Sequence, residues 1–597
     1  MAFYPIDIKP GINKELPSLT SEPCWRDSNL IRFKGGYPQK MGGWSIYGIT
    51  AGDQKLVGTP RSIHEWRTNN GRILLVVGTS EKLYLMDTLV RDITPLRSTD
   101  ILNNAFDTTI GSTQVIVNHV AHGANLGDYV TFSSATSPAL VDTELNANHK
   151  ILDIINPDSY IITLATAATS TLTGTGGTGV TAEYEIHVGA NTAIKSFGWS
   201  AGAWGIEGWG SERSISPETL DIRVWSLTNY GEDLVACHES SPLYRLTYND
   251  VSPTDRAVEI TEAPNANNLV TVTSGDRHLV TFGSSSINGD PQDAMLVRWA
   301  DQETTNDWIP TAENTSGEQI LVGGSRIVSV KKTQADTLIW TDTALHRMQY
   351  IGPPFTFGFQ KLGANCGAIG KNSTVVHNGI SFWMGDNDFY MYDGVVKTLP
   401  CTLHRYVFEK INRVQADKIM AGLNSEFHEV IWFYPSDTVT ENDRYVVFNY
   451  IEQVWYHGEL SRTSWIDAGL SRYPKAGDPE GYFYEHENGT SAAGSAMNSY
   501  IESGELDVDD GYKFVFIRRL LPDMVINQGS VDYIFKTRRY PHSTQYTDTV
   551  LTCQPDTEKL DTRIRTRQLV IRVESDEVNS AWRMGRSRID IRPDGRR

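Results

Sequence analysis

A repeated unit of short apolar segments separated by turn residues constrains the fold more than any other feature of this sequence. The apolar centres of the units fall at seven places along the chain: Leu74, Leu234, Val280, Leu338, Ile380, Val430 and Tyr482. From the second centre onward they are 42 to 58 residues apart, close to the roughly 40–50 residues of a propeller blade. A solenoid would need a tighter period and capping repeats. We therefore predict an all-β chain whose main body is a β-propeller of six or seven blades. Because propellers often close by joining strands from both ends of the chain, one of these units can be split or shared.

The clearest unit runs from Ser373 to Gly394. A short apolar segment is followed by Asn378-Gly379, then by a stronger apolar segment and by a third segment with alternating tyrosines. Asn-Gly between two apolar runs indicates a β-hairpin, because both residues tolerate positive φ. The next unit repeats this order, and residues 428–435, 444–450 and 453–458 predict three more strands.

Changes in composition divide the chain into five predicted segments. Residues 1–50 lack a clear period and read as an N-terminal arm that packs along a neighbouring surface. Residues 51–104 hold the first blade, and residues 188–497 hold the remaining blades. Residues 105–187, rich in Thr, Ala, Ser and Asn, interrupt the repeat and predict a small β-barrel inserted into a loop. Residues 498–597 contain apolar strands with some alternation and predict a C-terminal β-sandwich.

One motif in the inserted segment resembles a known module. The run from His122 to Phe132, His-Gly-Ala-Asn-Leu-Gly-Asp-Tyr-Val-Thr-Phe, resembles a small β-barrel found in many phage tail proteins and in ubiquitin-activating enzymes. The resemblance covers about 60 residues.

The main helical signal lies between Leu403 and Ala421. Leu403, Tyr406, Val407, Ile411 and Val414 fall close to one face of a helix. We expect this helix to connect two blades and to pack on the side of the propeller.

Charge and cysteine content limit the classes of function. The formal net charge is −19, which argues against a protein that grips nucleic acid along its surface but not against one that lets it slide past. The five cysteines are far apart and form no Cys-x-x-Cys pair, so neither a metal site nor a disulfide framework is expected. Apolar runs are shorter than a membrane span, and no secretion signal is recognisable. We expect a protein made in a cytoplasm.

Two groups of residues are candidates for interaction with partners. Trp199, Trp204 and Trp209 recur every five residues between glycines, a spacing that fits neither a helix nor a strand. They predict either a loop that binds a partner or a sugar, or a coiled loop whose rings fill gaps between blades. The last 35 residues hold ten arginines and five acidic residues. Arg583, Arg586 and Arg588 from this stretch predict a docking surface for an acidic partner or nucleic acid; a solvated strand face is the alternative.

Motifs for catalysis are absent from the sequence. There is no His-Glu-x-x-His, no Gly-x-Ser-x-Gly and no Walker loop, and no blade shows the Ser-x-Asp-x-Gly-x-Thr-Trp turn of sialidases. The histidines are scattered, and paired carboxylates carry no information without geometry. We expect no enzymatic activity and no cofactor.

Three stretches resemble one protein family. They are residues 403–412, 416–422 and 428–433, read as Leu-His-Arg-Tyr-Val-Phe-Glu-Lys-Ile-Asn, Ala-Asp-Lys-Ile-Met-Ala-Gly and His-Glu-Val-Ile-Trp-Phe. They resemble the packaged-DNA stabilisation protein of short-tailed phages, also called the tail hub or nozzle. Residues 563–572, Arg-Ile-Arg-Thr-Arg-Gln-Leu-Val-Ile-Arg, are similar to the closing strand of that family. The resemblance extends over about residues 220–597.

The resemblance implies a structural protein of the virion tail, assembled in the cytoplasm of the bacterial host. Its copies would form a ring, typically a hexamer, below the portal and its adaptor. The ring would retain packaged DNA, pass double-stranded DNA without sequence specificity during ejection, and hold tail fibres or spikes and a needle or plug. We further hypothesise that the wall of the channel is acidic, while the arginine-rich C-terminal part faces a neighbour or the adaptor.

A second hypothesis is a receptor- or glycan-binding propeller of a phage tail. It would use the tryptophan-rich loop and the inserted barrel. A glycan array separates the two hypotheses, because only the second predicts sugar binding.

Overall fold

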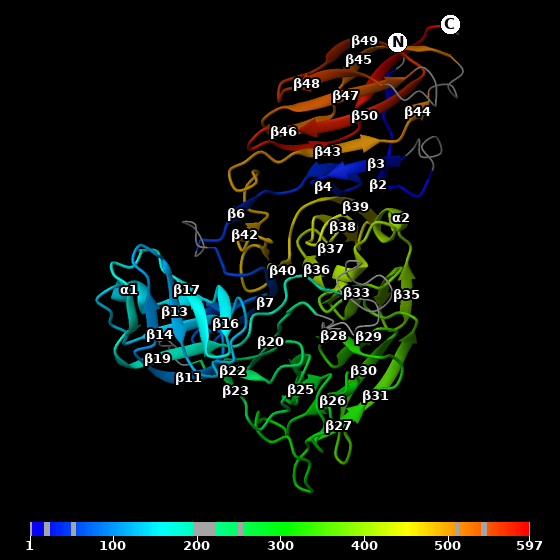
Figure 1. Ribbon diagram of the computed structural model, residues 1–597. Coiled ribbons are helices and arrows are strands. Elements are labelled where there is room, and N and C mark those ends of the chain that lie inside the picture. The colour runs from blue at the N-terminus through cyan, green and yellow to red at the C-terminus, as the bar shows by residue number, and fades with distance from the viewer. Residues whose placement is uncertain are drawn as a thin grey trace, which may run out of the picture.

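The computed structural model describes residues 3–16, 24–48, 55–194, 221–248, 255–507, 513–538 and 546–595. Within these residues the chain is almost entirely β, with many small antiparallel sheets. Figure 1 shows an elongated molecule in which a C-terminal group of sheets lies beyond one edge of a larger group, and an inserted domain lies at its side. No helix in the described part is long and apolar enough to span a membrane.

Seven four-stranded sheets follow one another in the larger group. In chain order they are β7 (Pro60–Arg67), β8 (Ile73–Thr79), β9 (Leu83–Met86) and β10 (Val90–Asp92); β20 (Ser226–Tyr230), β21 (Asp233–Cys237), β22 (Tyr244–Leu246) and β23 (Val258–Glu259); β24 (Leu269–Val272), β25 (Leu279–Phe282), β26 (Leu296–Trp299) and β27 (Gly317–Ile320); β28 (Ile327–Lys332), β29 (Thr337–Thr341), β30 (Ala344–Gly352) and β31 (Thr356–Ala364); β32 (Thr374–His377), β33 (Ile380–Met384), β34 (Phe389–Tyr392) and β35 (Val396–Leu399); β36 (Met420–Asn424), β37 (Glu429–Tyr434), β38 (Arg444–Asn449) and β39 (Val454–Glu459); and β40 (Ser464–Ile466), β41 (Lys475–Gly477) and β42 (Phe483–His486) with β6 (Trp44–Ile46).

The first strands of these sheets contact one another in a closed order. β7 contacts β20, and contacts then continue through β24, β28, β32, β36 and β40, which in turn contacts β7. The seventh sheet takes its outer strand, β6, from the N-terminal part of the chain. One sheet is thus shared between distant parts of the chain, as the repeat led us to expect. We call these seven sheets the ring of sheets.

The Asn378-Gly379 hairpin is confirmed. β32 and β33 pair up to His377 and Ile380, and the two turn residues have φ of 49° and 80°. These positive values are those that a tight two-residue hairpin turn needs.

The segment between β10 and β20 forms a separate domain, the insertion, with its own hydrophobic core. Its two sheets run β11-β19-β14-β15 and β16-β17-β13-β12-β18. The elements are β11 (Leu96–Asn103), β12 (Phe106–Thr108), β13 (Gln114–Asn118), β14 (Tyr129–Ser133), α1 (Asp142–Leu145), β15 (Asn148–Lys150), β16 (Asp153–Asn156), β17 (Ser159–Thr163), β18 (Leu172–Thr175) and β19 (Thr178–Glu185). Its first and last strands pair, with Leu96 opposite Glu185, so the chain leaves the ring of sheets and returns at one place.

A buried ion cluster fixes the insertion to the first sheet of the ring. Lys82 Nζ lies 3.0 Å from Glu185 and 2.7 Å from Asp92, and Arg256 Nη2 lies 3.2 Å from Glu185. Burial raises the pKa of Glu185, and the neighbouring charge of Asp92 adds to this effect. Because Lys82 is buried, the acids around it supply the partners that a buried charge requires.

Three C-terminal sheets combine strands from both ends of the sequence. Their orders are β1-β52-β45-β49, β4-β5-β51-β46 and β2-β3-β43-β50-β47-β48, with β44 also pairing with β50. The N-terminal arm supplies β1 (Phe3–Pro5), β2 (Lys9–Ile12), β3 (Cys24–Asn29), β4 (Ile31–Lys34) and β5 (Tyr37–Lys40). The other strands are β43 (Ser499–Ser503), β44 (Leu506–Asp507), β45 (Val515–Leu521), β46 (Met524–Gln528), β47 (Val531–Arg538), β48 (Thr547–Cys553), β49 (Leu560–Thr566), β50 (Gln568–Ser575), β51 (Ala581–Met584) and β52 (Arg588–Pro593).

The largest hydrophobic core runs from the C-terminal sheets into the ring of sheets without interruption. It includes Phe33 from the arm, Trp432 and Trp455 from the ring, and Ile571 and Trp582 from the C-terminal sheets. The two groups of sheets therefore form one packed body.

The continuous helix predicted over Leu403 to Ala421 is wrong. The structure has a short helix α2 (His404–Phe408), a 3₁₀ segment (Arg413–Lys418), and then strand β36. Between the two helical pieces, Ile411 forms an isolated bridge with Ser436, and the side chain of Asn412 accepts a hydrogen bond from the Val414 N–H. Asn412 thus caps a new turn and does not continue the old one, and it also donates hydrogen bonds to the segment after β37, at the carbonyls of Pro435 and Val439.

Candidate functional site: a cleft between the ring and the C-terminal sheets

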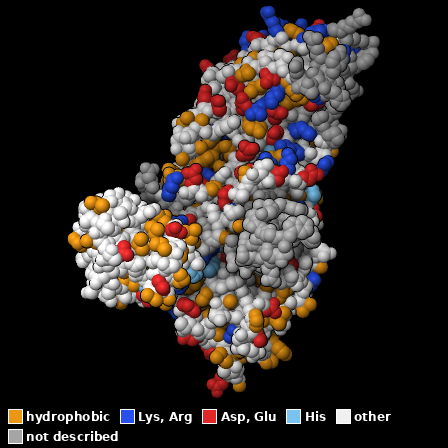
Figure 2. Space-filling model, in the orientation of Figure 1, with side chains coloured by type: hydrophobic (Ala, Val, Ile, Leu, Met, Phe, Trp, Pro, Cys, Tyr) orange, Lys and Arg blue, Asp and Glu red, His pale blue; other side chains and the backbone are white. Residues whose placement is uncertain are grey.

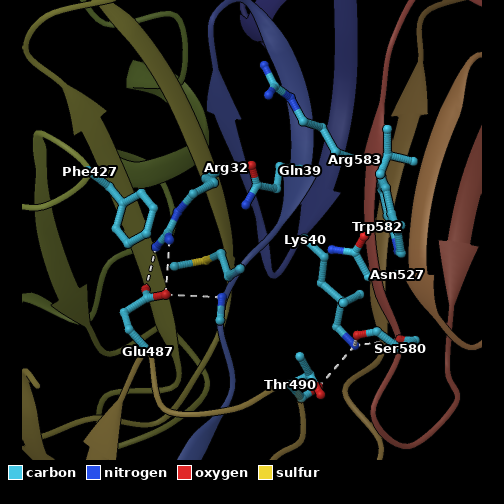
Figure 3. A pocket seen from close by; sticks show the side chains of 14 residues that line it. Arg32, Gln39, Lys40, Phe427, Glu487, Thr490, Asn527, Ser580, Trp582 and Arg583 are labelled. Carbon is cyan, nitrogen blue, oxygen red and sulfur yellow. Dashed lines mark hydrogen bonds and ion pairs between the residues drawn. The ribbon is translucent and has the colours of Figure 1, made fainter.

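A polar cleft of about 390 Å³ lies where the ring of sheets meets the C-terminal sheets. Strands β4 and β5 of the arm form its middle, as Figure 3 shows, and β46 and β51 form one wall. The other wall comes from the ring, through Phe427 before β37 and Glu487 after β42. The arm thus brings residues from three distant parts of the sequence together.

Arg32 on β4 is the central side chain of one wall. Its Nε donates to Glu429 at 2.9 Å, its Nη2 donates to the second Glu429 oxygen at 3.1 Å, and its Nη1 donates to Glu487 at 3.0 Å. The Phe427 ring lies over the guanidinium, 3.5 Å from its centroid. Arg32 is fully buried, as is Glu429. Such bidentate pairing is the geometry for which the planar guanidinium is suited.

The charges of this network determine the pKa values within it. Burial tends to lower the pKa of Arg32, but the carboxylates of Glu429 and Glu487 raise it above its ordinary value. Burial raises the pKa of Glu429, against the attraction of Arg32. Tyr456 also donates its hydroxyl proton to Glu429. Removing one partner from a buried ion pair typically costs about 3–5 kcal/mol, so this network holds the arm to the ring.

Lys40 on β5 is a buried amine on the opposite side of the cleft. Its Nζ donates to the Ser580 hydroxyl at 2.6 Å, to the Ser580 carbonyl at 2.8 Å and to the Thr490 carbonyl at 3.4 Å. No carboxylate of the described residues pairs with it. Burial therefore lowers the pKa of Lys40 to about 8.

The three arginines chosen from the sequence fall at separate places. Arg583 on β51 lines the cleft, and its Nη2 donates to the Lys34 carbonyl at 3.0 Å. Arg586 follows β51 and pairs with Asp7 of the arm at 2.6 Å. Arg588 begins β52 and is exposed, opposite Pro5 in the pairing with β1. Arg583 and Arg586 therefore contact the arm of their own chain through their side chains, and Arg588 meets it through the backbone pairing of β52 with β1.

Trp199, Trp204 and Trp209 lie outside the described residues. The interaction predicted for them stays a prediction.

Sequence reasoning missed Arg32 and Lys40. Both lie in the run from Asn29 to Trp44, which was interpreted only as an extended arm. Their partners are hundreds of residues away, and Arg32 and Glu429 are 397 positions apart. The sequence held one local indication of this site. An arm that packs against a neighbouring surface would bury part of its strands, so the cations Arg32 and Lys40 on those strands would need partners.

The described residues contain no group of three or more His, Cys, Asp or Glu side chains arranged to hold a metal ion. All five cysteines are free thiols.

Figure 2 shows how charged side chains are distributed over one face of the molecule. Over the insertion they are sparse, while both signs are frequent over the C-terminal sheets. This contrast follows the difference in composition between the two segments.

Comparisons with known proteins place the chain in no family. No family model and no curated protein matches it.

Among solved structures, it is similar to the phage phi92 endosialidase with a TM-score of 0.16 and 11% identity, covering 78% of this chain and 54% of the endosialidase. It is similar to an exo-β-1,3-galactanase from Phanerochaete chrysosporium with a TM-score of 0.23 and 11% identity, covering 63% and 97% of the two chains. A functionally unknown protein from Desulfotomaculum acetoxidans gives a TM-score of 0.25 and 12% identity, with coverage of 65% and 95%. Values this low support no conclusion about function. The structure itself defines the class, a nearly all-β protein built from many small sheets.

Proposed function

We propose that this protein is a structural component of a short-tailed phage tail, the hub or nozzle. Its copies assemble into a ring below the portal and its adaptor, retain packaged DNA and provide the channel for ejection. The ring also holds fibres or spikes and a needle or plug. The proposal rests on the resemblance of residues 403–433 and 563–572 to that family, and it includes no enzymatic activity.

One structural observation carries the proposal further, namely the path of the N-terminal arm. Five strands of the arm enter the three C-terminal sheets, and a sixth, β6, completes the seventh sheet of the ring. Arg32 adds buried ion pairs to Glu429 and Glu487. Strands, core and ion pairs thus join the two groups of sheets into one body. Such a body suits a subunit that transmits force between neighbouring parts of a particle.

We interpret the closed order of contacts among the first strands as a seven-bladed β-propeller. The cavity along its axis measures about 400 Å³, the size of a small-ligand pocket. Duplex DNA would therefore pass between subunits, through the centre of a ring of copies. A head-to-tail interface that closes on itself makes such a ring.

The net charge of the chain would affect the electrostatic field at the wall of that channel. Six copies at −19 each carry −114 charges in total, enough to shape the field inside a ring if the acids face inward. An acidic wall would repel phosphates and let DNA slide.

Reversal of the charges at Arg583, Arg586 and Arg588 to glutamate tests the proposal. We expect tail assembly to fail while the subunit still folds, because Arg588 is exposed and the other two side chains make contacts near the surface. Electron microscopy of particles from a complementation assay gives the result, and circular dichroism of the purified variant verifies folding.

The matched control reverses Arg277, Lys397 and Arg405, which lie in the ring of sheets and its connecting helix α2 and whose side chains are about half or more exposed. Normal particles from the Arg583, Arg586 and Arg588 variant would contradict docking through these arginines. Binding of the wild-type protein to a glycan array would favour the receptor-binding alternative.

A further inference from the structure

The axial cavity of the ring of sheets is lined by the first strands of all seven sheets. Three side chains that can carry a positive charge line this cavity: His64, Lys331 and Lys332. His64 lies in the middle of β7, three sheets away around the ring from β28. Lys331 and Lys332 are the last two residues of β28, so they lie at the end of the cavity where that strand ends.

The two lysines have no anionic partner in the described part of the chain. Neither ammonium makes an ion pair or a hydrogen bond there; Lys331 is half-buried and Lys332 is exposed. Partial removal from water lowers the pKa of each. The protein as a whole is strongly acidic. Two uncompensated cations that line one cavity of such an acidic chain are therefore an arrangement that a bound anion would complete.

Three carboxylates in or near the cavity have partners other than the two lysines. Glu65, next to His64, is buried and pairs with Lys475 at 2.8 Å. Asp467 lines the cavity after β40, and its carboxylate accepts from the N–H groups of Ser425 and Ala468. Glu239 pairs with Lys371, a cation that also lines the cavity. None of these three acids forms an ion pair with Lys331 or Lys332.

Neutral polar side chains line the same cavity. His64 Nε2 is 3.0 Å from the Asn229 side-chain oxygen, which fixes the ring orientation. Burial, before the nearby lysines, lowers the pKa of His64 to about 4, so the ring is neutral at physiological pH. The hydroxyls of Thr228 and Thr271 line the same cavity and make no hydrogen bond within the described residues.

We propose that this end of the axial cavity is a binding site for a phosphate group carried by a small molecule. The two ammonium groups match the charge of a phosphate monoester, which is between about −1.5 and −2 at neutral pH. The Thr228 and Thr271 hydroxyls supply hydrogen bonds to its oxygens. A cavity of about 400 Å³ leaves space for a small organic group on the phosphate.

Isothermal titration calorimetry of the full chain tests the site, with inorganic phosphate in one arm and glucose 6-phosphate in the other. We expect saturable binding of at least one probe, and a loss of at least tenfold in affinity in the variant Lys331→Met/Lys332→Met. The variant Lys331→Arg/Lys332→Arg keeps both charges and should recover most of the binding. Tighter binding of the sugar phosphate would indicate a phosphate ester as the ligand, and equal binding would indicate free phosphate.

The matched control is Lys361→Met/Lys397→Met, which removes two exposed lysines from the outer strands β31 and β35. Circular dichroism and the melting temperature establish that each variant folds. Absence of binding of both probes to the wild type, or equal binding by the Lys331→Met/Lys332→Met variant, would overturn the proposal. The site lies within one chain, so its failure would leave the hub proposal unaffected.

Discussion

At the scale of single residues, the cleft shows two ways of burying a cation. Arg32 is surrounded by carboxylates and stays charged, whereas Lys40 has only a hydroxyl and two carbonyls as partners. Neutral acceptors satisfy hydrogen bonds but do not compensate a charge. Lys40 therefore bears a desolvation cost that Arg32 largely avoids.

Lys40 makes stability dependent on pH in the alkaline range. Its pKa is about 8 in the folded protein, against 10.5 in the unfolded chain, so the unfolded state binds more protons between these values. The contribution of Lys40 to the free energy of unfolding therefore rises as the pH increases from about 8 to 10.5, by at most about 3 kcal/mol. We expect the melting temperature of the wild type, relative to Lys40→Met, to increase between pH 7.5 and pH 10.

Differential scanning fluorimetry at matched pH values gives the difference in melting temperature between the wild type and Lys40→Met. The effects of other titrating groups cancel in this difference, because both proteins contain those groups. Lys9→Met, which removes an exposed lysine of β2, serves as the control and should show a constant difference. A constant difference for Lys40→Met as well would show that Lys40 is not desolvated.

At the scale of elements, tryptophans join successive sheets of the ring. The indole N–H of Trp225 donates to the Thr79 carbonyl at 3.0 Å, and that of Trp465 donates to the Leu423 carbonyl at 2.8 Å. Trp432 makes the same kind of bond to Ser373 at 3.1 Å. Each bond runs from one sheet to a neighbouring one, so the indole side chains both fill the space between sheets and fix the position of one sheet relative to the next.

Close packing of Trp465 depends on a glycine beneath it. A Cβ at Gly422 would lie 2.4 Å from Trp465 Cδ1, a distance that forces the indole to move. We expect Gly422→Ala to destabilise the protein by about 1–3 kcal/mol, the usual cost of overpacking. Urea denaturation followed by tryptophan fluorescence measures the effect. Gly469→Ala is the control, because no atom lies within 4 Å of its added Cβ; equal stability of the two variants would contradict this packing argument.

Local patterns predicted the elements better than their connections. The Asn378-Gly379 turn and the strands around it depend on neighbouring residues, and the sequence shows them directly. The helix predicted over Leu403 to Ala421 does not form as one element, because the Asn412 cap and the bridge between Ile411 and Ser436 interrupt it. The Arg32 network could not be predicted, because no periodicity relates residues 397 positions apart.

At the scale of the whole molecule, the insertion is an independent unit. It has its own core, and its first and last strands pair where the chain leaves the ring. We expect replacement of residues 98–183 by a short Gly-Ser turn to leave the ring folded, since Glu185 remains to pair with Lys82. The melting temperature should change by only a few degrees.

Removal of residues 1–46 is the matched contrast. It takes strands from three C-terminal sheets and from the seventh sheet of the ring, so the product should be insoluble or lack a cooperative transition. If loss of the insertion proved as damaging as loss of the arm, the insertion would be part of the folding unit. Expression yield and calorimetry of both deletions decide between these outcomes.

The pairing of β1 with β52 has a consequence for biosynthesis. The second strand of this pair leaves the ribosome more than five hundred residues after the first, so β1 has no partner strand while most of the polypeptide is translated. Unsatisfied strand edges of this kind attract wrong neighbours, and distant pairings form slowly. Folding of each chain should therefore end with the pairing of β1 and β52, and chaperones that shield the emerging arm should raise the yield of native protein.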